Sequence, residues 1–393
     1  MLETYRKESD DASGLAAGGA EVLGRPPADL AEVLAGLALG GPAQCALRAV
    51  SSTIELRVSE EHTVGNAAWI AEAFRRFFNA PEVTGVIVGG RSGESDSEHA
   101  TVRYWRDVVR HSIYGNLQSV LDEHCHVLRD WLSHPNLSND EQRADAAWDI
   151  GRKIGEALRL RSSQYRVDIP VRSNEDHRFC FEPHRMRTRF AVPYGTQRLD
   201  DDSGQQRVGF VSGAFNSPFW PFVLTSTSVG QEGLDFHLWC HAVVHWNLPT
   251  NPVDLEQREG RVHRYKGHAV RRNLAAKLGG DLLTDGVPTG RDLWDILFDK
   301  AVELSPESHG AIVPYWVFKD GPAKIQRHVP VLPFSRDEVT VSRLRKSLAA
   351  YRLAFGQPRQ EELIEFLGAD RTDEELRQLT SRLKIDLSPP AGA

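Results

Sequence analysis

Three short apolar runs, separated by turns and helices, constrain the fold more than any other feature of this sequence. They span residues 189–194, 222–227 and 242–246, and a helical pattern begins at about Pro252 after the third. Runs of this length and apolarity are typical of strands buried on both faces. Strands that alternate with helices predict an α/β fold with a parallel sheet.

The composition and periodicity of the chain divide it into four regions. Residues 1–27 are polar, glycine-rich and aperiodic, which predicts a flexible lead-in. Residues 28–165 carry apolar side chains at three- and four-residue spacing and predict a mainly helical region, with the run Val86–Val88 as a candidate strand. The α/β core is assigned to residues 166–280, and a mixed, largely helical accessory region to residues 281–393.

Finer elements are expected inside these regions. Helices are predicted over 30–39, 69–78, 102–132, 141–160, 341–355 and 358–367. A Gly-rich turn is expected after about residue 275, and the apolar run 311–318 is a further strand candidate.

Composition excludes several classes of protein. A chain of 393 residues suits two or three domains, and its net charge of −7 excludes a globally basic nucleic-acid coat protein. Its four cysteines are too few and too scattered for a disulfide scaffold or a paired-cysteine zinc site. The N-terminus mixes charges without an apolar core, and the longest uncharged run, 208–231, is interrupted by prolines. We expect a cytoplasmic protein without a membrane partner.

A predicted helix beginning at Pro252 carries a cluster of arginines. Asn251 is the expected N-cap, and Pro252 suits the first turn. At 3.6 residues per turn, Gln257, Arg261 and Arg264 would share one face of this helix. Two guanidinium groups fixed side by side can neutralise charge that develops on a transferring phosphoryl group. The run 258–272 as a whole holds six basic residues and one acidic residue.

A polar loop is expected where the second apolar run ends. It offers the hydroxyls of Thr225, Ser226, Thr227 and Ser228 at the carboxyl end of a strand, where open α/β sheets place ligands. Glycines at positions 230 and 233 allow close approach of the backbone, and the carboxylate at position 235 can accept a hydrogen bond from a ribose hydroxyl.

These two segments together resemble motifs V and VI of superfamily-2 helicases and translocases. The sequence QREGRVHR, residues 257–264, matches the family pattern Q-x-x-G-R-x-x-R at every fixed position. The run-up through Asn247-Leu248-Pro249 is similar to the chromatin-remodeller-like bacterial branch of the family. The resemblance covers residues 188–275 and implies one RecA-like domain, the C-terminal lobe of a helicase, flanked by helical regions.

The resemblance also implies roles for single residues. Arg261 and Arg264 would be arginine fingers, and Gln257 would lie beside the γ-phosphate of ATP. The nucleotide would be lined by Gly230, Gly233, Asp235 and Gly260. The nucleic-acid backbone would be contacted by Thr225, Ser226, Thr227 and Ser228.

Half of the expected ATP site is not recognisable in the sequence. No G-x-x-x-x-G-K-[ST] phosphate loop occurs, and the nearest candidate, residues 89–95, has no lysine. The acidic box Asp122-Glu123-His124-Cys125 falls inside a predicted helix, where an exposed helix face explains it better. We therefore expect the phosphate loop and the carboxylates that hold Mg²⁺ to come from another chain or segment.

Two clusters of metal-ligand residues have non-metal explanations. His237, Cys240, His241 and His245 would point to different sides of a strand and are better explained by a buried strand than by a zinc site. The neighbouring residues His124, Cys125 and His126 diverge by about 100° each on a helix and are expected at the surface. No metal site is predicted.

Two functions remain open from the sequence. The first is the C-terminal part of an ATP-dependent helicase or translocase acting on DNA or RNA, active with ATP and Mg²⁺ once a first RecA-like domain is supplied. The alternative is a non-catalytic module, derived from a helicase half, that binds nucleic acid or a partner protein.

Overall fold

The structure is a computed structural model in which the described residues fall into two compact units, treated separately below. The described residues are 28–57, 60–88, 100–132, 134, 137–159, 163–172, 179–188, 211–225, 235–285, 291–305, 312–354, 367 and 372–383. We call the first unit the helical unit; its described part lies within 28–188, 211–222 and 291–294. The second, the mixed unit, holds the other described residues from 223 onward.

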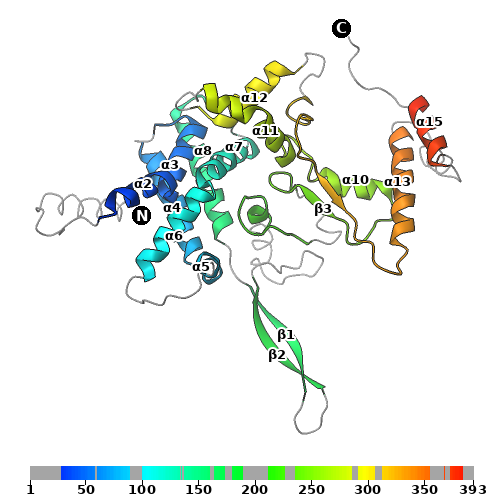
Figure 1. Cartoon of the computed structure of the whole chain (residues 1–393), viewed down its shortest axis with the longest axis horizontal. Coiled ribbons are helices and arrows are strands. Elements are labelled where there is room, and N and C mark those ends of the chain that lie inside the picture. The colour runs from blue at the N-terminus through cyan, green and yellow to red at the C-terminus, as the bar shows by residue number, and fades with distance from the viewer. Residues whose placement is uncertain are drawn as a thin grey trace, which may run out of the picture. The chain divides into compact units, whose positions relative to one another are not determined.

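The helical unit is built mainly of the helices labelled α2 to α8 in Figure 1. They are α2 (Leu30–Gly40), α3 (Pro42–Ile54), α4 (Glu61–Phe78), α5 (Pro81–Val88), α6 (Ala100–Tyr114), α7 (Leu117–Trp131) and α8 (Asp140–Leu158). The predicted helices over 30–39, 69–78 and 141–160 are confirmed. The predicted helix 102–132 is two helices, because Asn116 takes a left-handed conformation with φ of 53° and separates α6 from α7.

The core of the helical unit lies between α3, α4, α7 and α8. Its side chains come from the apolar positions that recur every three or four residues, including Ile54, Ile70, Phe74, Leu121 and Ile150. Glycines on α8 bring α4 close. A Cβ at Gly155 would lie 2.6 Å from Nε1 of Trp69, so no larger residue fits there without a shift.

One strand expected in this unit is a helix, and one apolar segment of the unit has the length of a membrane span. Val86–Val88 lie in helix α5, so the strand expected there is wrong. The segment Leu30–Ile54 is long and apolar enough to be a candidate membrane span, and it lies near the N-terminus. In the structure it forms two helices, because Gly41 has an extended backbone and Pro42 opens α3.

A two-stranded antiparallel ribbon, seen in Figure 1, follows the helices of this unit. Strand β1 (Ser163–Arg172) pairs with β2 (Phe179–Thr188), in a register that places Ser163 opposite Thr188 and Arg172 opposite Phe179. This ribbon was not predicted from the sequence.

The mixed unit combines helices with a short parallel sheet. Its described elements are β3 (Ala242–Val244), α10 (Pro252–Gly260), α11 (His268–Asp285), most of α12 (Leu293–Leu304), β4 (Gln326–His328), α13 (Asp337–Ala354) and α15 (Asp373–Leu383). β3 runs parallel to β4, with Ala242 opposite Gln326 and Val244 opposite His328. The strand expected at 242–246 and the helix expected over 341–355 are confirmed.

One buried amide connects α11 to the chain that leads into β4. Asn273 is 4% exposed, and its Nδ2 donates to the carbonyl oxygens of Phe318 and Ala323 at 2.9 and 3.0 Å. Its Oδ1 accepts from the backbone N–H of Ala323 at 2.7 Å. These three bonds satisfy backbone groups of a turn that has no strand partner to satisfy them.

Other strand predictions fail or lie outside the described residues. Residues 222–225 are irregular, and 312–318 form turns because the apolar run is broken by Pro314. The Gly-rich turn after residue 275 is wrong at Gly279 and Gly280, which lie inside α11. The strand candidate 189–194 and most of the helix expected over 358–367 are outside the described residues. A parallel pair in an α/β arrangement is therefore what the structure shows of the predicted sheet.

Candidate functional site

The segments that carry the two predicted motifs lie against each other in the mixed unit. The backbone N–H of Phe236 donates to the carbonyl oxygen of Arg261 at 3.0 Å. Further along, the N–H of His268 donates to the carbonyl oxygen of His237 at 3.1 Å. These two bonds bring the chain after Asp235 alongside the arginine segment, so residues 25 and 31 positions apart in sequence become neighbours.

Helix α10 forms as its capping residues predict. The side chain of Asn251 accepts from the N–H of Val253 at 2.9 Å, and Pro252 occupies the first turn. The helix ends at Gly260, however, and Arg261 is its C-cap. Arg264 therefore lies in the following loop, and the predicted single helix face for the three residues is wrong beyond Gln257.

The structure nevertheless brings two predicted site residues together. Nη2 of Arg264 lies 3.3 Å from Oδ1 of Asp235, and each side chain is almost half exposed, 46% and 47%. Arg261 is half-buried, and Gln257 is exposed on α10. A carboxylate and two guanidinium groups thus come from adjacent backbone segments, with the pair still accessible to solvent.

The remaining predicted residues are placed only in part. Thr225 is described and exposed, while Ser226, Thr227, Ser228, Gly230 and Gly233 lie outside the described residues. Gly260 ends α10, and a Cβ added there would meet no atom of the described residues within 4 Å. Packing among those residues therefore gives no reason for a glycine at this position.

Glu259 ties the end of α10 to both strands. Its Oε1 accepts from Nε2 of His245 at 3.0 Å, and the guanidinium of Arg327 binds both carboxylate oxygens. Burial alone would raise the pKa of Glu259, but the hydrogen bonds from His245 and Arg327 outweigh it and lower that pKa to about 2. The turn that precedes Arg261 is thus fixed to β3 and β4. This role of Glu259 was not predicted from the sequence. The one signal for it is an acidic residue inside an arginine-rich motif.

Arg271 fixes the other end of the arginine segment. It is fully buried, and its Nη1 donates to the carbonyl oxygen of Lys266 at 2.7 Å. Its guanidinium also donates to the carbonyl oxygen of Leu238 and lies 5.2 Å from the ring centroid of Trp239. Arg258 donates to the carbonyl oxygen of Asn247 at 2.9 Å. These two basic residues of the run therefore make contacts within the fold, as Arg264 does with Asp235 and Lys266 with the ring of Phe298.

The histidines of this unit are spread over different surroundings. His245 is buried against Glu259, while His241 is exposed. Burial lowers the pKa of His237 to about 4 and that of His268 to about 3, so both rings are neutral at pH 7. Among the described residues, His237, Cys240, His241 and His245 do not form a metal-binding group.

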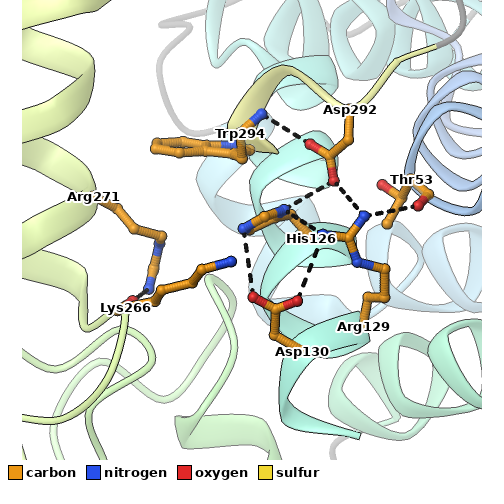
Figure 2. Close-up of polar contacts among 8 residues, drawn as sticks. All are labelled: Thr53, His126, Arg129, Asp130, Lys266, Arg271, Asp292 and Trp294. Carbon is orange, nitrogen blue, oxygen red and sulfur yellow. Dashed lines mark hydrogen bonds and ion pairs between the residues drawn. The ribbon is translucent and has the colours of Figure 1, made fainter. Parts of the chain in front are cut away.

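A buried ionic cluster lies in the helical unit (Figure 2). Nδ1 of His126 lies 2.8 Å from Oδ2 of Asp292, and Nη1 of Arg129 lies 3.3 Å from the same oxygen. Arg129 also donates to the carbonyl oxygen of Thr53 at 3.1 Å, and Asp292 accepts from the N–H of Trp294 at 2.8 Å. A metal ion bound to that oxygen would be repelled by the guanidinium, so the cluster is better suited to structure than to metal binding.

This cluster corrects an expectation about α7. His124, Cys125 and His126 are all buried, so the predicted surface position of this trio is wrong. The ring of His124 packs edge to face on Phe219 with centroids 5.9 Å apart. Burial also raises the pKa of the neighbouring Asp122 to about 6. The acidic box is thus not an exposed face: His124 and Cys125 are buried, and Asp122 and Glu123 are half-buried.

Comparison with known proteins identifies the segment around these motifs. The family of helicase conserved C-terminal domains matches residues 179–266. This segment is a superfamily-2 helicase C-terminal domain. Over 42 residues the chain is 45% identical to the uncharacterized ATP-dependent helicase YqhH of Bacillus subtilis (strain 168). That match covers 11% of this chain and 7% of the relative, and no solved structure matches the chain.

The segment that matches the helicase C-terminal family contains the described residues of the candidate site from Asp235 onward. Asp235, Gln257, Gly260, Arg261 and Arg264 all lie within the helicase C-terminal domain. The His126 cluster lies in the described residues before it and at residues 292–294 after it. Among the described residues, the match therefore covers strand β2, residues 211–222 of the helical unit and residues 223–225 and 235–266 of the mixed unit.

Proposed function

We propose that this chain supplies the arginine-finger half of the ATP site of a nucleic-acid helicase or translocase. The observation that carries the proposal is the ion pair of Arg264 with Asp235, beside Arg261, inside a helicase C-terminal domain. Folding needs no exposed cluster of this kind, because an ion pair between half-exposed side chains contributes less than about 1 kcal/mol to stability.

The chemistry follows from the charges of these side chains. Arg261 and Arg264 would bind the γ-phosphate oxygens and neutralise the charge that develops there during hydrolysis. Asp235 would accept a hydrogen bond from the ribose once Arg264 turns to the phosphates. Gln257, exposed on α10, would lie beside the γ-phosphate, and Gly260 would let the nucleotide approach the end of the helix.

The site needs a second half. The two carboxylates beside the arginines are already paired, Asp235 with Arg264 and Glu259 with His245 and Arg327. They therefore do not fit the role of Mg²⁺ ligands. The phosphate loop and acidic box would come from a first RecA-like domain on another chain or segment.

Nucleic acid is the proposed partner polymer. The hydroxyls of Thr225 to Ser228 would donate hydrogen bonds to the phosphate backbone of DNA or RNA. Changes in the ATP cleft would then move the polymer along this loop. We place this activity in the cytoplasm, as the sparse and scattered cysteines favour.

The test is ATP hydrolysis by this chain alone and after mixing with a polypeptide that carries a phosphate loop and an acidic box, with and without DNA or RNA. The proposal expects turnover only in the mixture, stimulated by nucleic acid. Turnover by the isolated chain would overturn the half-site proposal. Nucleic-acid binding with no turnover in any mixture would favour the non-catalytic module instead.

A further inference from the structure

Three aromatic rings form a continuous stack in the mixed unit. The ring centroids of Phe298 and Tyr315 are 5.5 Å apart at an interplanar angle of 13°, and those of Tyr315 and Tyr265 are 5.5 Å apart at 20°. Phe298 is 2% exposed, whereas Tyr265 is 43% exposed. The stack therefore runs from the core of the unit to its surface, directly after Arg264 in the sequence.

A fourth ring lies beside the exposed end of the stack. Trp316 is 41% exposed, and its centroid lies 6.1 Å from that of Tyr265 at an angle of 67°. Two aromatic rings are thus exposed next to each other, and they come from segments about 50 residues apart in sequence. Burial of apolar surface accounts for Phe298 and Tyr315, but it does not account for exposing both of their neighbours.

The backbone holds these rings in place. The N–H of Lys266 donates to the carbonyl oxygen of Tyr315 at 2.7 Å, and Nε2 of His263 lies 3.0 Å from the carbonyl oxygen of Trp316. Arg271 binds the carbonyl oxygen of Lys266 from the other side. The exposed rings are therefore pre-organised, so little conformational entropy would be lost when a ligand stacks on them.

Positive charge accompanies the rings. Nζ of Lys266 lies 4.6 Å from the ring centroid of Phe298 and 5.7 Å from that of Tyr265. Arg264 precedes Tyr265 in sequence and is exposed. Flat aromatic faces combined with cationic side chains are what unpaired bases and their phosphates require.

We propose that Tyr265 and Trp316 form a stacking platform for an unpaired base of single-stranded nucleic acid. The inference rests on the proposed function, because it names the form of nucleic acid that this helicase lobe would hold. Stacking is expected to tolerate any base, since every base presents a π face. Lys266, whose Nζ lies 5.7 Å from the ring centroid of Tyr265, would bind a backbone phosphate of the strand whose base stacks on that ring.

The test is the affinity of this chain, without ATP or a partner, for a fluorescein-labelled oligothymidylate and for an oligonucleotide of the same length made of abasic sites. Both carry the same phosphates, but only the first carries bases. We expect the wild-type chain to bind the oligothymidylate more tightly. Tyr265→Ala is expected to weaken oligothymidylate binding roughly 5- to 100-fold and to leave abasic binding unchanged.

Three further variants separate stacking from folding. Tyr265→Phe keeps the ring and should retain the affinity of the wild type. Trp316→Ala should weaken oligothymidylate binding in the same direction as Tyr265→Ala. Trp246→Ala removes another exposed ring of this unit, 77% exposed and outside the stack, and should leave both affinities unchanged.

Specific results would overturn the platform. Equal affinity of the wild-type chain for the two oligonucleotides, or equal loss for both in Tyr265→Ala, would show that only phosphates are bound. If Tyr265→Ala bound a fluorescent ATP analogue more weakly but bound the oligothymidylate as the wild type does, the rings would belong to the ATP site. Either failure would leave the arginine-finger proposal standing, because that proposal is tested by turnover and this one by strand binding without ATP.

Discussion

Nη2 of Arg264 lies 3.3 Å from Oδ1 of Asp235, so two side chains to which the family resemblance gives different parts of a nucleotide neutralise each other. A nucleotide that used both would have to separate them, with the phosphates taking Arg264 and the ribose taking Asp235. The ion pair would then keep Arg264 close to its site of action before ATP arrives.

Asp235→Ala is expected to change the free energy of unfolding by less than about 1 kcal/mol, because both partners of its ion pair are almost half exposed. The same variant should weaken ATP binding by the assembled site, since the ribose loses its acceptor. Urea unfolding and nucleotide titration measure the two effects. A large loss of stability would mean that Asp235 is a folding residue.

Glu259→Gln should destabilise the protein at pH 7 by about 3 kcal/mol, because the pKa of Glu259 falls from 4.5 to about 2 on folding. A carboxylate whose pKa is lowered on folding contributes its full stabilisation at pH values above its pKa in the unfolded state. That stability is lost as the pH falls from about 4.5 through about 2. The difference between wild type and variant in urea unfolding should therefore shrink over this range. A difference that stays constant with pH would contradict the proposed role of Glu259.

Asp292→Ala should cost about 3–5 kcal/mol, because it removes the nearer carboxylate from the buried guanidinium of Arg129 and leaves only Asp130, 3.5 Å away. Although burial raises it, contacts with His126 and Arg129 hold the pKa of Asp292 below its usual value, so this stability too is lost as the pH falls through that lowered pKa. Glu32→Ala is a matched control: its carboxylate is 78% exposed and 3.9 Å from Arg110. The control should shift urea unfolding by less than about 0.5 kcal/mol.

Local sequence signals predicted local structure well in this protein. Asn251 and Pro252 located the start of α10, and the apolar spacing of Ile70 and Phe74 located α4. These signals act over one or two helical turns, where neighbouring residues decide the conformation. The conserved-motif spacing likewise located Asp235, Arg261 and Arg264 in a helicase C-terminal domain.

The features that could not be predicted from the sequence depend mainly on contacts between residues that are far apart along the chain. His126 has no local signal that separates a surface histidine from one buried against Asp292, 166 positions away. Strand β4 is three residues long and polar, and it forms because Ala242–Val244 supplies its partner backbone. Val86–Val88 was read as a strand because β-branched residues favour strands, but the short helix α5 includes it. The stack that ends at Tyr265 likewise depends on Tyr315 and Phe298.

The most direct test of the proposed function is nucleic-acid-stimulated ATP hydrolysis by the mixture of this chain with a first RecA-like domain, comparing wild type with Arg261→Ala. Arg352→Ala is the control, since Arg352 binds Glu256 on α10 but lies outside the motif. The arginine-finger role predicts a loss of turnover of about 10³-fold or more for Arg261→Ala and none for the control. Unchanged turnover in Arg261→Ala would contradict it.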